Sequence, residues 1–418
     1  MKTDRIAAFP QQHFPGGRTA CLVLFLLLGG MVPAHGAGVF RVDAASTAPT
    51  PDGQSWETAY PTLQAAVDAA VTAGGGELWV KAGVYTSTAG QAVLLGGGVD
   101  LYGGFAGAET DRSQRDWKAN PTVIHGQDAR RCVTCTGNAT VDGFTVAHGR
   151  VSAFGGGMYQ GTAVNCTFLA NTVTASGGDS ASGGGMYMGT AVNCAFTGNL
   201  AVTTGASAGG GGMAGGTAIN CTFMGNAATG GNACGGGMGG GTAVNCTFFG
   251  NTTSTTGATA AGGGMCNGTA VNCTFVRNST IGGAGLSGGG GMAAATAKNC
   301  IFWGNTALSD PEVFFMTSVT YSCVKGGYEG EGNISEDPRL AGPPDNLRLL
   351  AGSPCLDTGT ADGAPADDIV GTARPQGAGV DMGAYESAPL GVPHAPVVGA
   401  DASGANPPMW TWTPGGGG

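Results

Sequence analysis

Side chains able to do acid–base chemistry are scarce in the middle of this chain of 418 residues. Between Val151 and Ser309 the charged residues are Asp179, Arg277 and Lys298, and they occupy non-equivalent positions in the internal repeat described below. Hydrolysis of a glycosidic bond needs a pair of carboxyl groups, and this stretch does not supply one. The sequence therefore predicts that the central part of the chain is not catalytic.

A denser group of ionisable residues precedes this stretch. Asp142, His148 and Arg150 follow one another closely, and His125 with Asp128 lies somewhat earlier. A carboxylate, an imidazole and a guanidinium are groups that a lyase or a glycosidase could use as acid and base. These residue types are also typical of solvated turns, and that is the interpretation we favour.

Uncharged residues able to form hydrogen bonds are much more frequent than charged ones. Asn165 and Thr167 flank Cys166, and Asn193 and Asn220 recur at the same point of later segments. In an extended strand Asn165 and Thr167 share one face, opposite Cys166. We expect a glycan or another surface to bind this polar face through Asn165, Thr167, Asn193 and Asn220.

The cysteines do not have the spacing of a metal centre. Cys132 and Cys135 would face opposite sides of a strand, and no second pair lies nearby, so zinc is not expected. Cys234 and Cys266 lie outside the repeated pattern described below, and their pairing stays open.

Calcium is an alternative for the C-terminal part of the chain, where carboxylates gather. Oxygen ligands of this kind suit Ca²⁺, although the spacing is not that of an EF-hand. The candidate ligands are Asp357, Asp362, Asp367, Asp368 and Asp381. Apart from calcium, no cofactor is expected.

An internal repeat organises the middle of the chain. Each copy has a glycine triplet followed by Met, then an Asn-Cys pair, a Phe two residues after the Cys and an Asn three residues after the Phe. The columns of equivalent residues are Cys166, Cys194, Cys221, Cys246, Cys273 and Cys300; Phe168, Phe196, Phe223, Phe248, Phe275 and Phe302; and Asn171, Asn199, Asn226, Asn251, Asn278 and Asn305. The copies differ in length only in the Gly/Ser/Thr/Ala stretch before the next triplet, where we expect loops.

The hydrophobic period within a copy is that of a strand. Val164, Cys166 and Phe168 alternate with Asn165 and Thr167, and the glycine runs break any helix. We expect the Val, Cys, Phe and Met of each copy to point into a common core, with a second strand at 157–162. Such copies form the coils of a parallel β-helix, stacked at a spacing of ~4.8 Å.

Stacking gives each column a structural role. The Cys column is predicted to stay reduced, because parallel Cβ vectors hold the Cβ atoms too far apart for bridging. The Asn column that contains Asn171 is predicted to bond the backbone in turns, because Asn forms such bonds and tolerates a left-handed φ.

The remaining chain predicts flanking segments. Residues 1–36 have the layout of a signal peptide, 37–75 form an N-terminal cap with a helix near 60–73, and 76–325 form the β-helix. Residues 326–388 form a tail module. Residues 389–418 are a Pro/Gly-rich linker, in which Trp410 and Trp412 alternate with Thr like the start of a truncated immunoglobulin-like module.

Composition excludes several classes of protein. Charged residues make up 11% and hydrophobic residues 42%, so disorder driven by charge is excluded. The net charge of −10 and the 17 scattered Lys and Arg do not suit a nucleic-acid binder. No transmembrane helix is expected in the mature chain.

Some of these segments resemble known families. Ser55-Trp56, Leu63-Gln-Ala-Ala66 and Leu78-Trp-Val80 resemble the start of secreted bacterial right-handed parallel β-helix proteins. The run Val380-Asp-Met-Gly-Ala-Tyr-Glu386 resembles the tail module that follows such helices in surface-anchored proteins. The repeats resemble those of the polymorphic outer-membrane proteins, which implies an all-β, right-handed solenoid at the cell surface and adhesion as its role.

Three functional hypotheses remain open. The first is a secreted or outer-membrane-associated scaffold for adhesion or surface display, without enzymatic activity. The second is a polysaccharide lyase or glycoside hydrolase that uses the residues around Asp142. The third is a purely structural spacer of the cell envelope.

Overall fold

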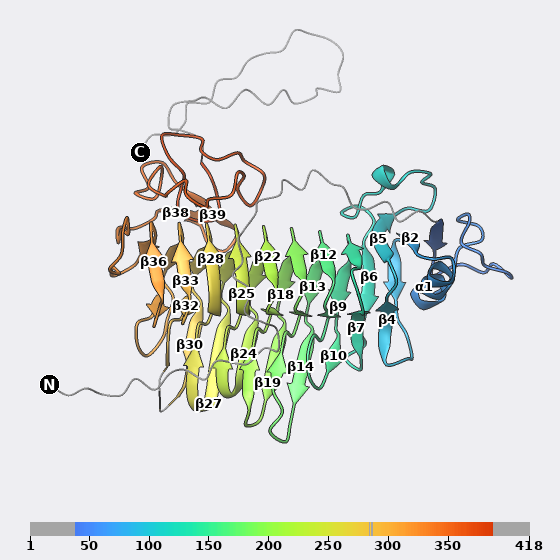
Figure 1. Cartoon of the computed structure of the whole chain (residues 1–418), viewed down its shortest axis with the longest axis horizontal. Helices are drawn as coiled ribbons and strands as arrows, with labels where there is room; N and C mark the ends of the chain where they lie inside the picture. Colours follow the sequence, from blue (N-terminus) through green and yellow to red (C-terminus); the bar gives the residue numbers. More distant parts are fainter. Residues whose placement is uncertain (1–37, 284, 286, 388–418) are drawn as a thin grey trace, which may run out of the picture.

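The computed structural model describes residues 38–283, 285 and 287–387, together with all their side chains except that of Thr256. The predicted signal peptide and the 389–418 segment lie outside this part of the chain. Within it the fold is a parallel β-helix, as the repeat predicted, and it is right-handed, as the family resemblance implied (Figure 1). No helix in the described part is long and apolar enough to cross a membrane.

Sheet A is the largest of the faces of the rod. Each coil contributes one or two short strands to it, in register with the coils before and after. Its strands are β1 Val39–Val42, β2 Gly76–Lys81, β4 Gln91–Leu95, β5 Val99–Phe105, β7 Arg131–Cys135, β8 Thr140–Asp142, β11 Met158–Tyr159, β12 Thr162–Val164, β16 Met186–Tyr187, β17 Thr190–Val192, β21 Met213–Ala214, β22 Thr217–Ile219, β25 Met238–Val244, β28 Met265–Val271, β32 Met292–Ala293, β33 Thr296–Lys298, β35 Val313–Phe314 and β36 Ser318–Thr320.

Sheet B is a single ladder of short strands that carries the Phe column. Its strands are β3 Gly83–Tyr85, β6 Thr122–His125, β9 Thr145–Ala147, β13 Thr167–Leu169, β18 Ala195–Thr197, β23 Thr222–Met224, β26 Thr247–Phe249, β29 Thr274–Val276, β34 Ile301–Trp303 and β37 Cys323–Val324.

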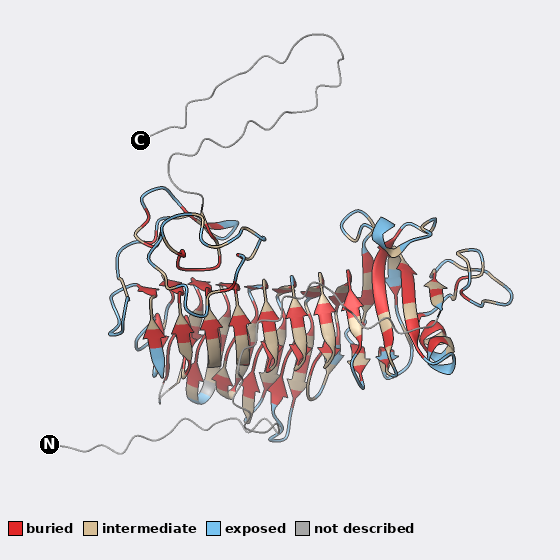
Figure 2. Ribbon diagram, turned by 45° about the horizontal axis from the view of Figure 1, so that its top comes forward, coloured by how far each residue is buried: buried red, intermediate tan, exposed pale blue. Residues whose placement is uncertain are grey.

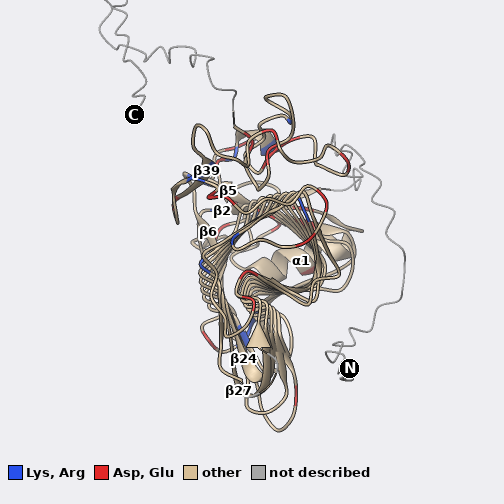
Figure 3. Ribbon diagram, turned by 90° about the vertical axis from the view of Figure 1, so that its left-hand side faces the viewer, with Lys and Arg blue, Asp and Glu red and all other residues tan. Residues whose placement is uncertain are grey.

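Sheet C is built from the variable stretches, so the prediction that these are loops was wrong. Its strands are β10 Arg150–Val151, β14 Thr172–Ala175, β15 Ala181–Ser182, β19 Leu200–Thr203, β20 Ser207–Gly209, β24 Ala227–Cys234, β27 Thr252–Ala261, β30 Ser279–Ile281 and β31 Ser287–Gly288. In the end-on view the coils extend here into a narrow fin around β24 and β27 (Figure 3). Small residues such as Ala175, Ala181 and Ala201 are buried within it, which allows its outgoing and returning strands to pack closely.

Buried residues recur along the strands of every coil (Figure 2), and the core of the rod consists of columns of identical side chains. The Phe column is a continuous stack whose neighbouring ring centroids lie 4.5–4.8 Å apart. Met, Cys and Ala columns are also buried. The expectation for Val164 was wrong. Ala163 points into the core and Val164 lies on the outer face, because the inward–outward alternation of β12 does not continue through the corner to Cys166.

This break in the alternation lies at a corner between sheets A and B. Sequence alternation predicted one strand through Asn165, whereas β12 ends at Val164 and β13 begins at Thr167. The second strand predicted at 157–162 is likewise divided between β11 and β12. A corner is needed because a coil must change direction to close around its core.

The buried Asn column stabilises the second corner, between sheets B and C. Asn199 Nδ2 donates to the Phe168 carbonyl and to Asn226 Oδ1, each at 2.9 Å, and its Oδ1 accepts from the backbone N–H of Asn171. The left-handed φ at this corner belongs to the residue before the Asn, such as Ala170 with φ 52°, and not to the Asn itself.

The ends of the core are covered by other elements. Helix α1, Leu63–Thr72, buries Leu63, Ala66 and Val67 against the first coils, and the Thr62 hydroxyl caps it. Strand β1 pairs with β2, so sheet A already begins inside the segment expected to be only a cap. The tail contains an antiparallel hairpin, β38 Leu340–Gly342 and β39 Asn346–Leu349.

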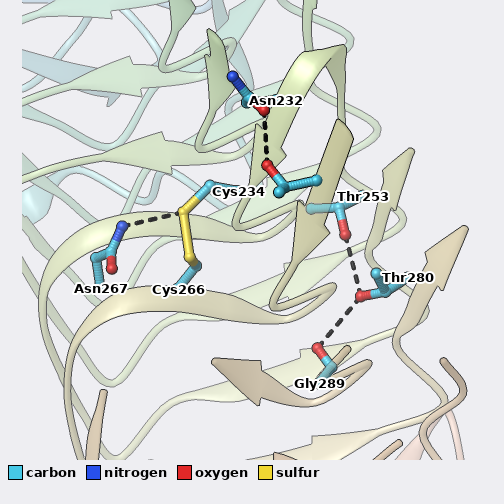
Figure 4. Close-up of a disulfide and its surroundings, with 8 residues drawn as sticks. Asn232, Cys234, Thr253, Cys266, Asn267, Thr280 and Gly289 are labelled. Atoms are coloured by element: carbon cyan, nitrogen blue, oxygen red, sulfur yellow. Dashed lines mark hydrogen bonds between the residues drawn. A yellow bond between two sulfur atoms is a disulfide. The ribbon is translucent and has the colours of Figure 1, made fainter. Parts of the chain in front are cut away.

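The cysteines divide into buried thiols and one disulfide. Cys234 and Cys266 are bonded between neighbouring coils at the base of the fin (Figure 4). The columnar cysteines are unbridged. Cys132 and Cys135 both lie in the core, so the expectation that they face opposite sides was wrong.

We expect Phe223→Ala to lower the free energy of unfolding by about 3–5 kcal/mol, because it leaves a cavity between two stacked rings. Met224→Ala, at the adjacent position with 45% of its surface exposed, serves as the control and should change stability by less than about 0.5 kcal/mol. Urea unfolding followed by circular dichroism measures both. Equal destabilisation by the two changes would contradict the stacked core.

We also expect a clear difference in reactivity among the cysteines. Burial raises the pKa of the Cys221 and Cys246 thiols well above the usual range, so iodoacetamide should modify them only after the chain is unfolded. Non-reducing peptide mapping of the same sample should find Cys234 linked to Cys266. Labelling of Cys221 in the native protein at the rate of an exposed thiol would contradict the structure.

Candidate functional site

The Asn-Cys-Thr corner presents two polar side chains on the outside of each coil. Asn165 adopts φ 50°, a left-handed conformation that Asn tolerates better than most residues. This turn points Cys166 into the core, whereas Asn165 and Thr167 lie at the surface. The expectation that Asn165 belongs to a strand was therefore wrong, although it does share a face with Thr167.

The corner asparagines form an outer column of linked amides. Asn165 Nδ2 donates to Asp142 Oδ1 at 3.0 Å, Asn193 Nδ2 to Asn165 Oδ1 at 3.4 Å, and Asn220 Nδ2 to Asn193 Oδ1 at 3.2 Å. Each amide uses one N–H in this ladder. The second N–H of Asn165, Asn193 and Asn220 has no partner among the described residues.

A groove of 710 Å³ lies over these three amides. Two features on the same edge of the rod bound it: the loop after β5, and the tail module above the later coils (Figure 1). Trp117 and Lys118 line it at the loop, and Ile369, Val370 and Tyr385 at the tail. Its floor contains all four residues predicted to bind a ligand, together with Thr145 and Thr222.

The groove is almost without charge. Among the described residues, Lys118 is the one charged residue in its lining, and no carboxylate lines it. The stacked coils carry few charged residues overall (Figure 3). The groove can therefore donate and accept hydrogen bonds and contact apolar surfaces, but its lining does not hold the two carboxyl groups that glycoside hydrolysis requires.

The tail module covers the second half of the outer column. Asn245, Asn272 and Asn299 are at most 2% exposed, whereas Asn193 in the groove is exposed. The polar face predicted along the whole rod is thus open over its first coils only.

The residues considered for catalysis fall into two separate groups. Asp142 forms an ion pair with Arg115 at 2.6 Å and accepts from Asn165 at the sheet A–B corner. His148 lies beyond strand β9, where Asp128 contacts its Nδ1 at 3.3 Å. The structure therefore does not bring Asp142 and His148 into one site.

His148 belongs instead to a surface cluster at the sheet B–C corner. Its ring stacks on that of His125 with centroids 4.8 Å apart. The His125 Nδ1 accepts from the backbone N–H of Gln127 at 2.9 Å, and Arg150 is exposed. These contacts are those of polar turns on successive coils.

A second groove, of 490 Å³, was missed by the sequence analysis. Glu77, Trp79, Arg112 and Arg115 line it, and Trp117 lines both grooves. Glu77 is already bonded, since Oε1 pairs with Arg112 at 2.6 Å and Oε2 accepts from Trp79 Nε1 at 2.9 Å. The only sequence signal was the alternation of charged and aromatic residues in β2 and β5.

The carboxylates considered for calcium have other partners. Asp362 pairs with Lys298 at 2.7 Å, and Asp368 accepts from the backbone N–H groups of Val370 and Thr372. Asp357 Oδ1 accepts from the Gly379 N–H at 3.0 Å. Asp367 is exposed at the surface of the tail. No group of three metal-ligating side chains is assembled in residues 38–283, 285 and 287–387.

Asp381 lies in a buried part of the tail. It accepts from the Asp357 and Ser387 N–H groups, and burial, with a contribution from Glu386, raises its pKa to about 6. Nearby, Arg374 and Glu386 form a fully buried ion pair at 2.7 Å. The tail is therefore held in shape by buried charges next to the covered asparagines.

No protein-family model matches the chain, and no curated protein matches it. Among solved structures, the pectate lyase Pel9A is 14% identical with a TM-score of 0.34, over 83% of this chain and 96% of Pel9A. The tailspike protein gp49 of Acinetobacter baumannii bacteriophage Fri1, a capsular polysaccharide depolymerase, is also 14% identical. Its TM-score is 0.32, over 69% of this chain and 58% of the tailspike. Likeness at this level carries no information on activity.

The raised pKa of Asp381 predicts a pH dependence. This carboxyl keeps its proton to about pH 6 in the folded chain, but ionises near pH ~4 when unfolded. The unfolded chain then binds fewer protons in this window, so the free energy of unfolding falls as pH rises from about 4 to about 6. Asp381→Asn cannot ionise and removes this pH dependence. The free energy of unfolding of the variant should therefore rise relative to that of the wild type as the pH goes from about 4 to about 6.

Urea denaturation at the two ends of the window measures the effect. Asp367→Asn, at an exposed aspartate of the same module, is the control and should follow the wild type. A constant stability difference between Asp381→Asn and the wild type would contradict the raised pKa.

Proposed function

We propose that this protein is an extracellular or cell-surface scaffold that binds a glycan in the groove over Asn165, Asn193 and Asn220. The observation that carries the proposal is the open run of amide and hydroxyl groups on a rigid, uncharged floor. Sugars offer hydroxyl groups as both donors and acceptors, and a primary amide matches both roles.

The ends of the groove support the same proposal. Trp117 and Tyr385 are half-buried and face opposite ends of the same cavity. Aromatic rings offer rigid apolar surfaces together with a polar group at the edge, which suits the apolar face of a sugar ring. The spacing of successive coils, ~4.8 Å, allows an extended chain to contact several coils.

Binding without cleavage is the form of the proposal we favour over a lyase or glycosidase. The alternative site would use Asp142, which is bonded to Arg115 and Asn165. A catalytic acid or base must instead be within reach of a substrate proton. Adhesion or surface display is the role that fits a non-catalytic scaffold, whereas a structural spacer needs no groove.

A glycan array probed with the full chain tests the proposal. We expect binding that weakens about tenfold in Asn193→Gly, which corresponds to the loss of about 1.4 kcal/mol, or one hydrogen bond. Glycine keeps the left-handed corner, as Gly143 does with φ 81° at the equivalent position two coils earlier. Asn232→Ala, on the fin, is the control and should bind like the wild type.

Two outcomes would count against this function. Equal binding by Asn193→Gly and the wild type would place the ligand elsewhere. Release of unsaturated or reducing sugars, lost on Asp142→Asn, would favour the enzymatic alternative.

A further inference from the structure

The covered half of the outer column displays what these asparagines bind. Asn245 Nδ2 donates to the Asp367 carbonyl at 2.7 Å, and Asn272 Nδ2 donates to the Asp381 carbonyl at 3.1 Å. Asn299 makes a paired contact with Thr360, donating to its carbonyl and accepting from its N–H, both at 2.8 Å. These partners in the tail are main-chain amide groups, and the one side chain of the tail that joins them is Arg374, which donates to Asn245 Oδ1 at 3.5 Å.

The Thr column beside the asparagines behaves in the same way. Thr274 Oγ1 accepts from the backbone N–H of Ala384 at 3.0 Å. Thr274 is the register equivalent of Thr222 two coils earlier, through Thr247. At Asn245, Asn272, Asn299 and Thr274 the tail thus bonds the floor mainly through amide carbonyls and amide N–H groups.

The open corners have the same geometry as the covered ones. Asn193 and Asn220 adopt φ 53°, and Asn245 adopts φ 50°. The amide ladder runs through all three, because Asn245 Nδ2 donates to Asn220 Oδ1 at 3.1 Å. The floor of the groove is therefore a direct continuation of the interface between rod and tail.

We propose that the ligand of the groove is a glycan that carries acetamido groups, an N-acetylated aminosugar chain. This inference rests on the proposed glycan-binding function and specifies its ligand. The acetamido carbonyl takes the position that the Asp367 carbonyl has on Asn245, and accepts the second N–H of Asn193 or Asn220. The acetamido N–H donates to an amide oxygen or to Thr222, as Ala384 does to Thr274.

The apolar residues at the tail end fit the methyl group. Val370 is 57% exposed and lines the groove beside Ile369. An acetyl methyl covers such a surface, whereas a hydroxyl in its place gains little from it. In the part of the chain that the structure describes, Lys118 is also the one cationic residue of the groove lining, whereas a uronate or sulfated chain would select several.

A peptide cannot bind this floor by adding a strand to the sheet. Peptides commonly bind a sheet by adding a strand to its edge through main-chain hydrogen bonds. Here the main-chain groups of the floor are already paired between coils, with Asn193 N donating to Ile219 O at 3.0 Å and Thr167 N to Phe144 O at 2.9 Å. Only side chains remain available to a ligand.

Calorimetric titration of the full chain with defined oligosaccharides tests the inference. The probes are the hexamer of β-1,4-linked N-acetylglucosamine, its de-N-acetylated form and cellohexaose. We expect the acetylated hexamer to bind at least tenfold more tightly than the other two. That preference should decrease in Asn193→Gly and in Thr222→Val. The second change keeps the shape of the side chain and removes its hydroxyl.

Thr197→Ala, at the other end of a sheet B strand and outside the groove, is the matched control. Circular dichroism and the protection of the buried thiols check that each variant keeps the fold. A synthetic peptide of residues 378–387 is the competing probe, because it carries main-chain amides without a sugar.

The outcomes separate the two proposals. Equal or tighter binding of cellohexaose would overturn the acetamido assignment and leave a glycan groove in place. Tighter binding of the peptide than of any sugar would overturn it in favour of a protein partner. Failure of every glycan, here and on the array, would overturn the proposed function itself.

Discussion

Each side chain inside this rod has to pack against copies of itself. Coils stacked in register place every repeated residue ~4.8 Å from its equivalent, so only self-complementary side chains are accepted. Flat phenyl rings stack face to face, and a primary amide carries both a donor and an acceptor, so an Asn bonds the next Asn. Like charges at that spacing repel, which explains why the repeats contain so few charged residues.

The same constraint requires special residues where a column ends. The buried Asn column stops at Asn305, where the carboxylate of Glu312 replaces the next amide and also accepts the Gly304 N–H. Burial raises the pKa of Glu312, and the hydrogen bonds it accepts oppose that shift. At the start of the outer column, Asp142 accepts from Asn165 and is neutralised by Arg115. Charged residues in this protein thus lie mainly at the ends of columns and in the added segments, where repetition stops.

A repetitive surface becomes a particular site only where something interrupts it. The rod alone would offer six equivalent corners. The tail covers three of them with its own amides. The loop that carries Trp117 bounds the other three at the N-terminal end of the groove. The groove is the remaining length between these two segments, and the repeat itself supplies only its floor. We infer that specificity for a ligand comes from the loop and the tail at the two ends of the groove, because the floor between them is uniform.

The sequence by itself determined the coil, the columns and the polar character of the corner, because a repeat of fixed spacing allows few other arrangements. It predicted Phe168, Cys166 and Asn165 as members of three columns, but it misjudged the left-handed corner, since alternation across Asn165 resembles an uninterrupted strand. From the sequence, the variable stretches were predicted to be loops. A stretch such as Ala227–Cys234 has little apolar content that would mark a strand, and it becomes one only by pairing with the equivalent stretches of the neighbouring coils. Only the tertiary structure decided which asparagines stay open, since Asp367, which Asn245 contacts, lies 122 residues further along the chain, and most of the tail's contacts with these asparagines are made by backbone groups that carry no sequence signal.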